Sequence, residues 1–269
     1  MKNIIEIKDV NFFYGQHQIL KNINLNIKEH SFTTILGPNS SGKSTLIKLL
    51  LGLEKTEGKI KIDGILLTKE TISDIRKQLG VVFENSSDQL ISKTVEECLN
   101  FSLENTNYPK TKRKKQINKI INELKLESIL AKDLHNLSIG EKQKVAFATT
   151  LVTEPKILIL DGAFTMIENK TKNEILKILK DLQKNKKITI IMTTNDTNDC
   201  LLGDKIVIIQ EGTIIKEGST EEVCKEEKLF RQIGLELPFM VDLSIKLQYY
   251  GLIDKIIYDM NEMVDTIWK

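Results

Sequence analysis

The chain has 269 residues, of which 41% are hydrophobic and 28% are charged, and only four are prolines. This length and composition are typical of one large globular domain with a small appendage. The net charge of +2 provides no global attraction to nucleic acid, and the apolar runs fall well short of the about 20 residues that a membrane-spanning helix needs. Three cysteines without metal-type spacing and a charged start favour a protein that stays inside the cell.

Most of the chain alternates between predicted strands and helices. Short apolar or alternating stretches over residues 4–35 predict strands that end at Gly37, where a helix follows a glycine-rich turn. Residues 88–150 are predicted to be mostly helical, and the basic run Lys110–Lys115, which lacks interleaved aromatics, is interpreted as a solvated helix start. A helix over Lys172–Leu182 joins two strands and predicts their parallel pairing. The further predicted strands are Lys59–Ile62, Leu79–Phe83, Lys156–Leu160 and Ile188–Met192.

The end of the chain has a different character. Lys205–Ile209 and Thr213–Lys216 predict a hairpin, beyond which short helices are expected. We therefore expect a main domain at residues 1–218, with its helical part at about 88–150, and a C-terminal extension at residues 219–269. Apolar residues in the extension recur at three-to-four spacing and predict an amphipathic helix, which packs either on its own domain or on a partner. They are Ile253, Ile256, Ile257, Met260, Val264 and Ile267.

The glycine-rich turn carries a phosphate-binding motif. Residues 37–44 match G-x-x-x-x-G-K-[ST] between a predicted strand and a predicted helix. The glycines let successive N–H groups point at phosphate oxygens, and the helix N-terminus adds partial positive charge. We expect Lys43 to contact the β- and γ-phosphates and Ser44 to offer its hydroxyl to Mg²⁺. Asp161, after the buried strand Ile157–Leu160, is expected to hold Mg²⁺ through water. The predicted ATP-binding residues here are Gly37, Asn39, Ser40, Ser41, Gly42, Lys43, Ser44 and Thr45.

Residues 137–148, LSIGEKQKVAFA, resemble the signature sequence of ABC ATPases. The resemblance implies a dimer in which Ser138, Gly140 and Glu141 lie against the ATP that the other subunit binds. It also places Tyr14 where the family has an aromatic ring that stacks on adenine, although a lone tyrosine is more often a core residue.

Two further stretches narrow the resemblance. Residues 83–97 are similar to the F-Q-N-P-D-x-Q…T-V-x-x-D segment of energy-coupling factor (ECF) and cobalt/nickel importer ATPases, and residues 233–239 resemble the G-L-x-x-P block of their extension. The resemblance covers essentially the whole chain. It implies an α/β P-loop NTPase fold with a RecA-like parallel sheet core, an N-terminal antiparallel β part, a helical subdomain and a small helical C-terminal extension that contacts a dimer partner.

The resemblance also implies partners. They are a second ABC ATPase subunit, a transmembrane coupling (T) component and a substrate-binding membrane (S) component, with no nucleic acid. The chain is then expected at the cytoplasmic face of a bacterial membrane, in contact with it only through these partners. ATP-driven closure of the ATPase dimer would power uptake of vitamins or metal ions.

The sequence departs from the family at positions that serve hydrolysis. Gly162 stands where the family has the glutamate that polarises the attacking water, and Asn195 replaces the switch histidine. A positioned base contributes about 10²–10⁴-fold to rate, and glycine has no side chain to replace it. Asn195 can donate a hydrogen bond but carries no charge. Glu84 replaces the Q-loop glutamine and could still ligate Mg²⁺, while Glu168 replaces the D-loop aspartate.

These changes favour a heterodimer with one degenerate and one competent site. The degenerate site uses this chain's Lys43, Asp161 and Gly162, and the competent one combines a partner's Walker motifs with this chain's Ser138 and Gly140. Two alternatives stay open, a regulatory subunit that binds ATP without hydrolysing it and a generic ABC importer ATPase. A chromosome- or repair-type ABC ATPase is disfavoured because no long coiled-coil insertion interrupts the sequence.

Overall fold

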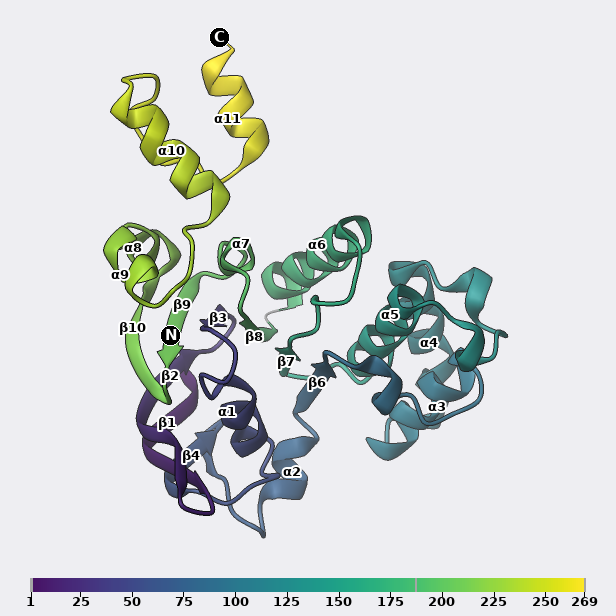
Figure 1. Cartoon of the computed structure of the whole chain (residues 1–269). Coiled ribbons are helices and arrows are strands. Elements are labelled where there is room, and N and C mark those ends of the chain that lie inside the picture. The colour runs from purple at the N-terminus through teal and green to yellow at the C-terminus, as the bar shows by residue number, and fades with distance from the viewer. Residues whose placement is uncertain (1, 187, 269) are drawn as a thin grey trace.

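The computed structural model describes residues 2–186 and 188–268, which form two β-sheets and several groups of helices (Figure 1). One sheet has the strand order β2-β1-β4-β5 and the other β10-β9-β3-β8-β7-β6. The strands are β1 Asn3–Tyr14, β2 His17–Lys28, β3 Phe32–Leu36, β4 Glu57–Ile62, β5 Ile65–Leu66, β6 Leu79–Phe83, β7 Ile157–Asp161, β8 Thr189–Thr194, β9 Lys205–Gln210 and β10 Thr213–Ser219. The helices are α1 Lys43–Leu50, α2 Ile72–Arg76, α3 Val95–Asn105, α4 Lys110–Leu124, α5 Ile139–Leu151, α6 Asn169–Lys186, α7 Thr197–Cys200, α8 Thr220–Cys224, α9 Glu227–Gln232, α10 Phe239–Tyr249 and α11 Met260–Ile267.

The larger sheet is parallel except at β10, which pairs antiparallel with β9. Its neighbouring strands end together, because Leu36 pairs with Thr194 and Asp161 pairs with both Thr193 and Phe83. The loops that follow β3, β6, β7 and β8 therefore leave the same edge of the sheet. The expected α/β fold, with its parallel core and its N-terminal antiparallel sheet, is confirmed.

Strand β7 shows how the sheet is covered on both faces. Ile157 and Ile159 join the core formed by α1 and the antiparallel sheet, whereas Leu158 and Leu160 join the core formed with α3–α6. All four side chains are buried, as in a parallel strand covered by layers on both faces. Helices α3–α5 lie beyond β6 at one end of the molecule (Figure 1). No helix in the described part of the chain is long and apolar enough to span a bilayer.

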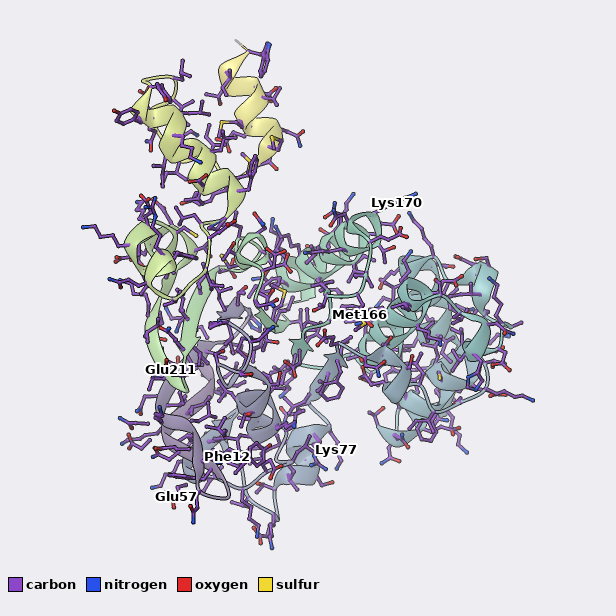
Figure 2. The ribbon with its side chains drawn as sticks, viewed as in Figure 1. Phe12, Glu57, Lys77, Met166, Lys170 and Glu211 are labelled. Atoms are coloured by element: carbon purple, nitrogen blue, oxygen red, sulfur yellow. The ribbon has the colours of Figure 1, made fainter. Side chains whose placement is uncertain are left out.

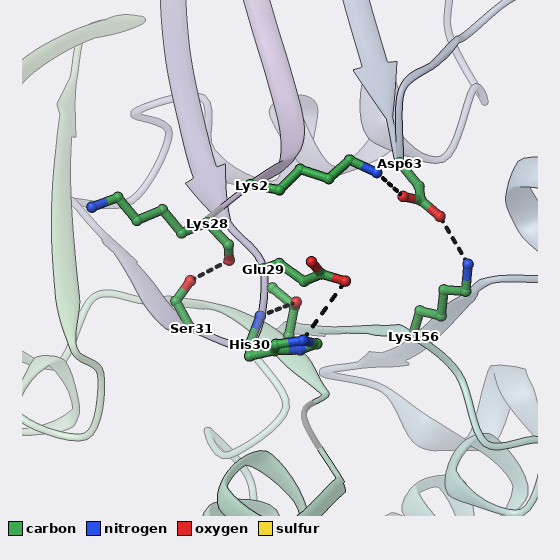
Figure 3. Close-up of polar contacts among 8 residues, drawn as sticks. Lys2, Lys28, Glu29, His30, Ser31, Asp63 and Lys156 are labelled. Carbon is green, nitrogen blue, oxygen red and sulfur yellow. Dashed lines mark hydrogen bonds and ion pairs between the residues drawn. The ribbon is translucent and has the colours of Figure 1, made fainter.

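An acidic side chain links the two sheets near the starts of β1 and β7. Asp63, after β4, accepts hydrogen bonds from Lys2 and Lys156, each with a nitrogen–oxygen distance of 2.8 Å (Figure 3). Lys156 directly precedes β7, so this bridge ties the antiparallel sheet to the parallel one. The hydrogen bonds from Lys156 and then Lys2 lower the pKa of Asp63 below its usual value.

The helices of the extension share a core with the parallel sheet. Val223 and Phe230 are fully buried and pack with Leu36 of β3 and Ile206 of β9. The prediction of a continuous amphipathic helix from Ile253 is wrong in its first half.

Helix α11 begins only at Met260, after its N-cap Asp259. Ile253 and Ile257 are buried in the irregular segment before it. The buried Ser244 hydroxyl accepts from the N–H of Ile257 at 2.9 Å and donates to its carbonyl at 3.0 Å. A side chain thus satisfies backbone groups that would otherwise bond along a helix.

Candidate functional site

The phosphate loop is shaped by close packing against β9. A Cβ added at Gly37 would lie 2.2 Å from the carbonyl oxygen of Ile209, so only glycine fits there. Ser40 has φ of 62°, and Gly42 has φ of 105° and is the N-cap of α1. This turn directs the start of α1 toward the open edge of the sheet, and a loop that ends in a helix N-terminus is suited to anions.

Lys43 folds back over the phosphate loop. Its Nζ donates to the carbonyl oxygens of Gly37 and Pro38, both at 2.8 Å, and lies 3.4 Å from the hydroxyl of Ser41. Burial lowers the pKa of Lys43, and the negative charge of Asp161 opposes that shift. The ammonium group is therefore held at the loop, beside the volume that a phosphate would occupy.

Asp161 lies where a divalent cation fits. Its Oδ1 accepts a hydrogen bond from Thr193 at 2.6 Å and from Ser44 at 3.1 Å. Thr193 in turn accepts from the N–H of Gly162 at 3.1 Å. Hydroxyl and carboxylate oxygens are the ligands that Mg²⁺ prefers, so Ser44 and Asp161 together fit this ion.

One cavity of about 720 Å³ joins these groups. It is lined by every residue predicted for ATP or Mg²⁺ except Gly37, and also by Gly162 and Asn195. Asn195 donates across it to the side-chain oxygen of Asn39 at 3.1 Å. The predicted residues that line it are Tyr14, Asn39, Ser40, Ser41, Gly42, Lys43, Ser44, Thr45, Glu84, Asp161, Gly162 and Asn195.

Tyr14 lies at the end of β1 and lines this cavity. Its ring packs edge-on against Phe12 with centroids 4.7 Å apart, and its hydroxyl lies 3.4 Å from a Glu54 oxygen. Phe12 is buried in the antiparallel sheet (Figure 2), whereas the Tyr14 side chain is 41% exposed. A supported ring with an open surface suits stacking on a flat base.

Glu84 and Gly162 are neighbours across the edge of the sheet, a juxtaposition that sequence reasoning missed. A Cβ added at Gly162 would lie 3.2 Å from Cβ and 3.3 Å from Oε2 of Glu84. Gly162 has φ of 65°, in the left-handed region that side-chain-bearing residues disfavour. The two positions meet because β6 and β7 pair with Phe83 opposite Asp161, and the sequence pattern does not determine that register.

The signature residues lie outside the cavity. Ser138 and Glu141 form a capping box at the start of α5: the Ser138 hydroxyl accepts from the N–H of Glu141 at 3.2 Å, and a Glu141 carboxylate oxygen accepts from the N–H of Ser138 at 2.8 Å. The hydrogen bond that the Ser138 N–H donates to the Glu141 carboxylate is the largest cause that lowers the pKa of Glu141. A Cβ at Gly140 would meet no atom of the described chain within 4 Å beyond its immediate neighbours. Ile139 beside it is 60% exposed. Within one chain, the signature and the cavity are therefore not brought together.

The chain is similar to known proteins over its whole length. A sequence model of the ABC transporter family matches residues 20–165. The energy-coupling factor transporter ATP-binding protein EcfA1 of Mesomycoplasma hyopneumoniae strain J is 36% identical over 270 residues, covering 99% of this chain and 98% of that protein. EcfA of Pediococcus pentosaceus is 34% identical and covers 94% of this chain and 91% of that protein.

Solved structures share the fold. The cbiO1 protein of Clostridium perfringens, part of the ABC transporter complex cbiONQ, has a TM-score of 0.78 at 32% identity, covering 94% of this chain and 100% of that one. The dimeric ATP-binding cassette MJ0796, bound to ADP and Pi, has a TM-score of 0.72 at 30% identity, covering 80% and 98%. Because sequence and fold both match over nearly the full length of such relatives, the chain belongs to the ABC transporter family, in the group of energy-coupling factor transporter ATP-binding proteins.

Proposed function

We propose that this chain is the ATP-binding subunit of a bacterial ECF-type importer, in which ATP-driven closure of an ATPase dimer powers uptake of a vitamin or metal ion. The observation that carries the proposal is the cavity in which a phosphate loop, the Ser44–Asp161 pair and the open ring of Tyr14 meet. A triphosphate with Mg²⁺ and a flat base is the ligand that such a set of groups suits. The relatives named for energy-coupling factor transporters support the importer assignment.

Each part of ATP has a complementary group in the cavity. Adenine stacks on Tyr14. The phosphates lie on the backbone N–H groups of the loop, residues 37–45, with Lys43 at the β- and γ-phosphates. Ser44 and Asp161 would hold Mg²⁺, which would neutralise phosphate charge.

The exposed signature favours a dimer. No contact in the described part of the chain requires a glycine at position 140, and the adjacent Ile139 is an exposed apolar side chain. Both features suit a surface that is covered when a second subunit approaches. Met166 is 53% exposed and lies between the sheet core and the helical part (Figure 2). A dimeric arrangement of a related cassette supports the same conclusion. We propose that Ser138 and Gly140 contact ATP bound by the partner.

The extension supplies a second surface for the partner. On α11, Met260, Val264 and Ile267 remain substantially exposed, whereas Met263 is buried against Met240. The stripe thus packs partly on its own helices and leaves an apolar face open. We propose that this face contacts the partner ATPase, and that the assembled dimer sits beneath the T and S components at the cytoplasmic face of the membrane.

The two ATP sites of such a dimer are unequal. Gly162 has no side chain and Asn195 has no charge to offer, so this chain's own site turns over slowly and the partner's site performs most of the hydrolysis. The alternative, a regulatory subunit that binds ATP but never hydrolyses it, rests on the same two positions. A generic ABC importer ATPase is the third candidate, and the subunits that co-purify with the chain distinguish it from an ECF assembly.

The test compares variants in the assembled complex. Lys43→Ala should weaken Mg-ATP binding to this chain, measured with a fluorescent ATP analogue. Ser138→Ala, which removes a donor to the partner's ATP, should reduce turnover and uptake more than Lys43→Ala does, because losing a transition-state donor costs about 10²–10³-fold. The proposal fails if the wild-type chain does not bind Mg-ATP. The asymmetry is reversed if Lys43→Ala abolishes turnover while Ser138→Ala stays near wild type.

A further inference from the structure

The carboxylate of Glu84 lines the cavity but takes no part in the hydrogen bonds described above. Of the described residues that line the cavity, two carry carboxylates, Asp161 and Glu84, and none is a histidine. Asp161 is engaged, because its Oδ1 accepts from both Ser44 and Thr193. Within the described ranges, no hydrogen bond or ion pair holds the Glu84 side chain, which is exposed to the cavity. Glu84 is therefore the cavity carboxylate that no hydrogen bond from the described residues holds.

The position of Glu84 is set by the sheet. It directly follows β6, whose last residue Phe83 pairs in parallel with Asp161, so Glu84 lies beside Gly162 on the neighbouring strand. Its Oε2 lies 3.3 Å from the point where a side chain at residue 162 would begin. The missing side chain at Gly162 is what leaves this volume to Glu84. The carboxylate thus projects from β6 into the space at the end of β7, in the cavity that Ser44 and Asp161 also line.

We propose that Glu84 is the general base for ATP hydrolysis at this chain's own site, in place of a side chain at position 162. This inference rests on the proposed function, because it requires ATP in the cavity. This chain's own site then hydrolyses ATP slowly, and that hydrolysis depends on Glu84. Gly162 and Glu84, which stand where the family has a glutamate and a glutamine, then act together. The glycine leaves room for the carboxylate that serves as the base.

The step that Glu84 performs is a proton transfer coupled to phosphoryl transfer. The carboxylate accepts one proton from a water molecule while the water oxygen forms a bond to the γ-phosphorus. The bond between that phosphorus and the β–γ bridging oxygen breaks, and ADP leaves with the electron pair on that oxygen. The products are ADP and inorganic phosphate, and the proton on Glu84 passes to solvent. A positioned base of this kind contributes about 10²–10⁴-fold.

The competing role for Glu84 is that of a magnesium ligand. The substitution Glu84→Gln separates the two roles, because an amide oxygen can ligate Mg²⁺ but an amide does not accept a proton as a carboxylate does. A ligand role predicts that the glutamine variant retains turnover. A base role predicts that it retains Mg-ATP binding and loses turnover.

The experiment uses the complex of this chain with its partner ATPase, in which the partner's own hydrolysis is abolished by substitution of its catalytic residue. Residual turnover, the dissociation constant for ATP, the Mg²⁺ concentration that half-saturates binding, and the lifetime of bound radiolabelled ATP are measured for wild type, Glu84→Gln and Glu84→Ala. Glu57→Gln, at an exposed glutamate of the antiparallel sheet that does not line the cavity (Figure 2), is the matched control.

We expect Glu84→Gln to reduce residual turnover at least 10-fold, to change ATP and Mg²⁺ affinities less than 2-fold, and to lengthen the lifetime of bound ATP. Glu57→Gln should match wild type in all four. The inference is overturned if Glu84→Gln turns over like wild type, if its defect disappears at saturating Mg²⁺, or if the wild-type complex shows no residual turnover while binding ATP. Absence of ATP binding in the wild-type complex would instead refute the proposed function.

Discussion

The substitution Gly140→Ala should leave the stability of the isolated chain unchanged or higher, and it should lower the activity of the assembled transporter. Gly140 lies in the first turn of α5, with a backbone outside the left-handed region, and a Cβ there would meet no atom of the described chain beyond its immediate neighbours within 4 Å. Alanine is the better helix former by up to about 1 kcal/mol. The free energy of unfolding of the isolated chain should therefore stay constant or rise by about 0.5–1 kcal/mol.

The assembled complex should respond in the opposite direction. Backbone donors act on a phosphate at about 2.7–3.1 Å, and a methyl group at Gly140 would stand between the start of α5 and the partner's γ-phosphate. Losing one such donor costs about 10²–10³-fold in rate. We expect ATP turnover and uptake by the complex to fall by about 100-fold, although the chain itself is no less stable.

Chemical unfolding of the isolated chain and steady-state ATPase activity of the complex are measured on the same preparations. Gly37→Ala is the contrasting control, because its Cβ would lie 2.2 Å from the carbonyl oxygen of Ile209 and must destabilise the isolated chain. Wild-type turnover in the Gly140→Ala complex would contradict a contact between the start of α5 and the partner's ATP. A loss of stability in the isolated Gly140→Ala chain would show instead that the glycine serves the chain's own fold.

Three further predictions follow from contacts away from the signature. Asp63→Asn should lower the free energy of unfolding by about 1 kcal/mol at pH 7. Because the folded pKa of Asp63 is lowered, its contribution is present above the unfolded value of about 4 and is lost as pH falls through the folded value, so urea unfolding of wild type and variant should converge in acid. Lys172→Met should cost about 3–5 kcal/mol in the same assay, because it leaves the largely buried Asp199 without its ion-pair partner; a cost below 1 kcal/mol would show that the pair contributes little. Val264→Asp should leave the chain folded yet weaken its assembly with the partner ATPase at least 10-fold by analytical ultracentrifugation, whereas unchanged assembly would show that the exposed face of α11 has no partner.

Local patterns were sufficient for the central part of the site. The phosphate motif at residues 37–44 specifies its own turn through glycines, and its position between an apolar stretch and a leucine-rich helix follows from hydrophobic periodicity. Asp161 was predicted for the same reason, because an acid after a four-residue apolar run marks the end of a buried strand. Residues 39–45 and Asp161, which line the cavity, were therefore predicted from short stretches of sequence, whereas Tyr14, Glu84 and Asn195 came from the family resemblance and Thr193 was not predicted.

In the C-terminal extension, the periodicity of apolar residues predicted a longer helix than the structure contains. Apolar residues from Ile253 to Ile267 recur at helical spacing, yet only the part from Met260 is helical. The Ser244 hydroxyl, contributed by α10, bonds both the N–H and the carbonyl of Ile257, and Asp259 caps the helix that follows. A spacing pattern shows which residues are buried but does not show which partner satisfies their backbone groups.

The relation between Glu84 and Gly162 was decided only by tertiary structure. Each position on its own was interpreted as a loss, of a glutamine at one and of a glutamate at the other. The parallel register that pairs Phe83 with Asp161 brings the two positions together at one edge of the sheet, and the left-handed backbone of Gly162 leaves room for the Glu84 carboxylate. Pairing between strands more than seventy residues apart depends on the packing of the whole sheet, so the sequence determined which groups are present and the fold determined which of them meet.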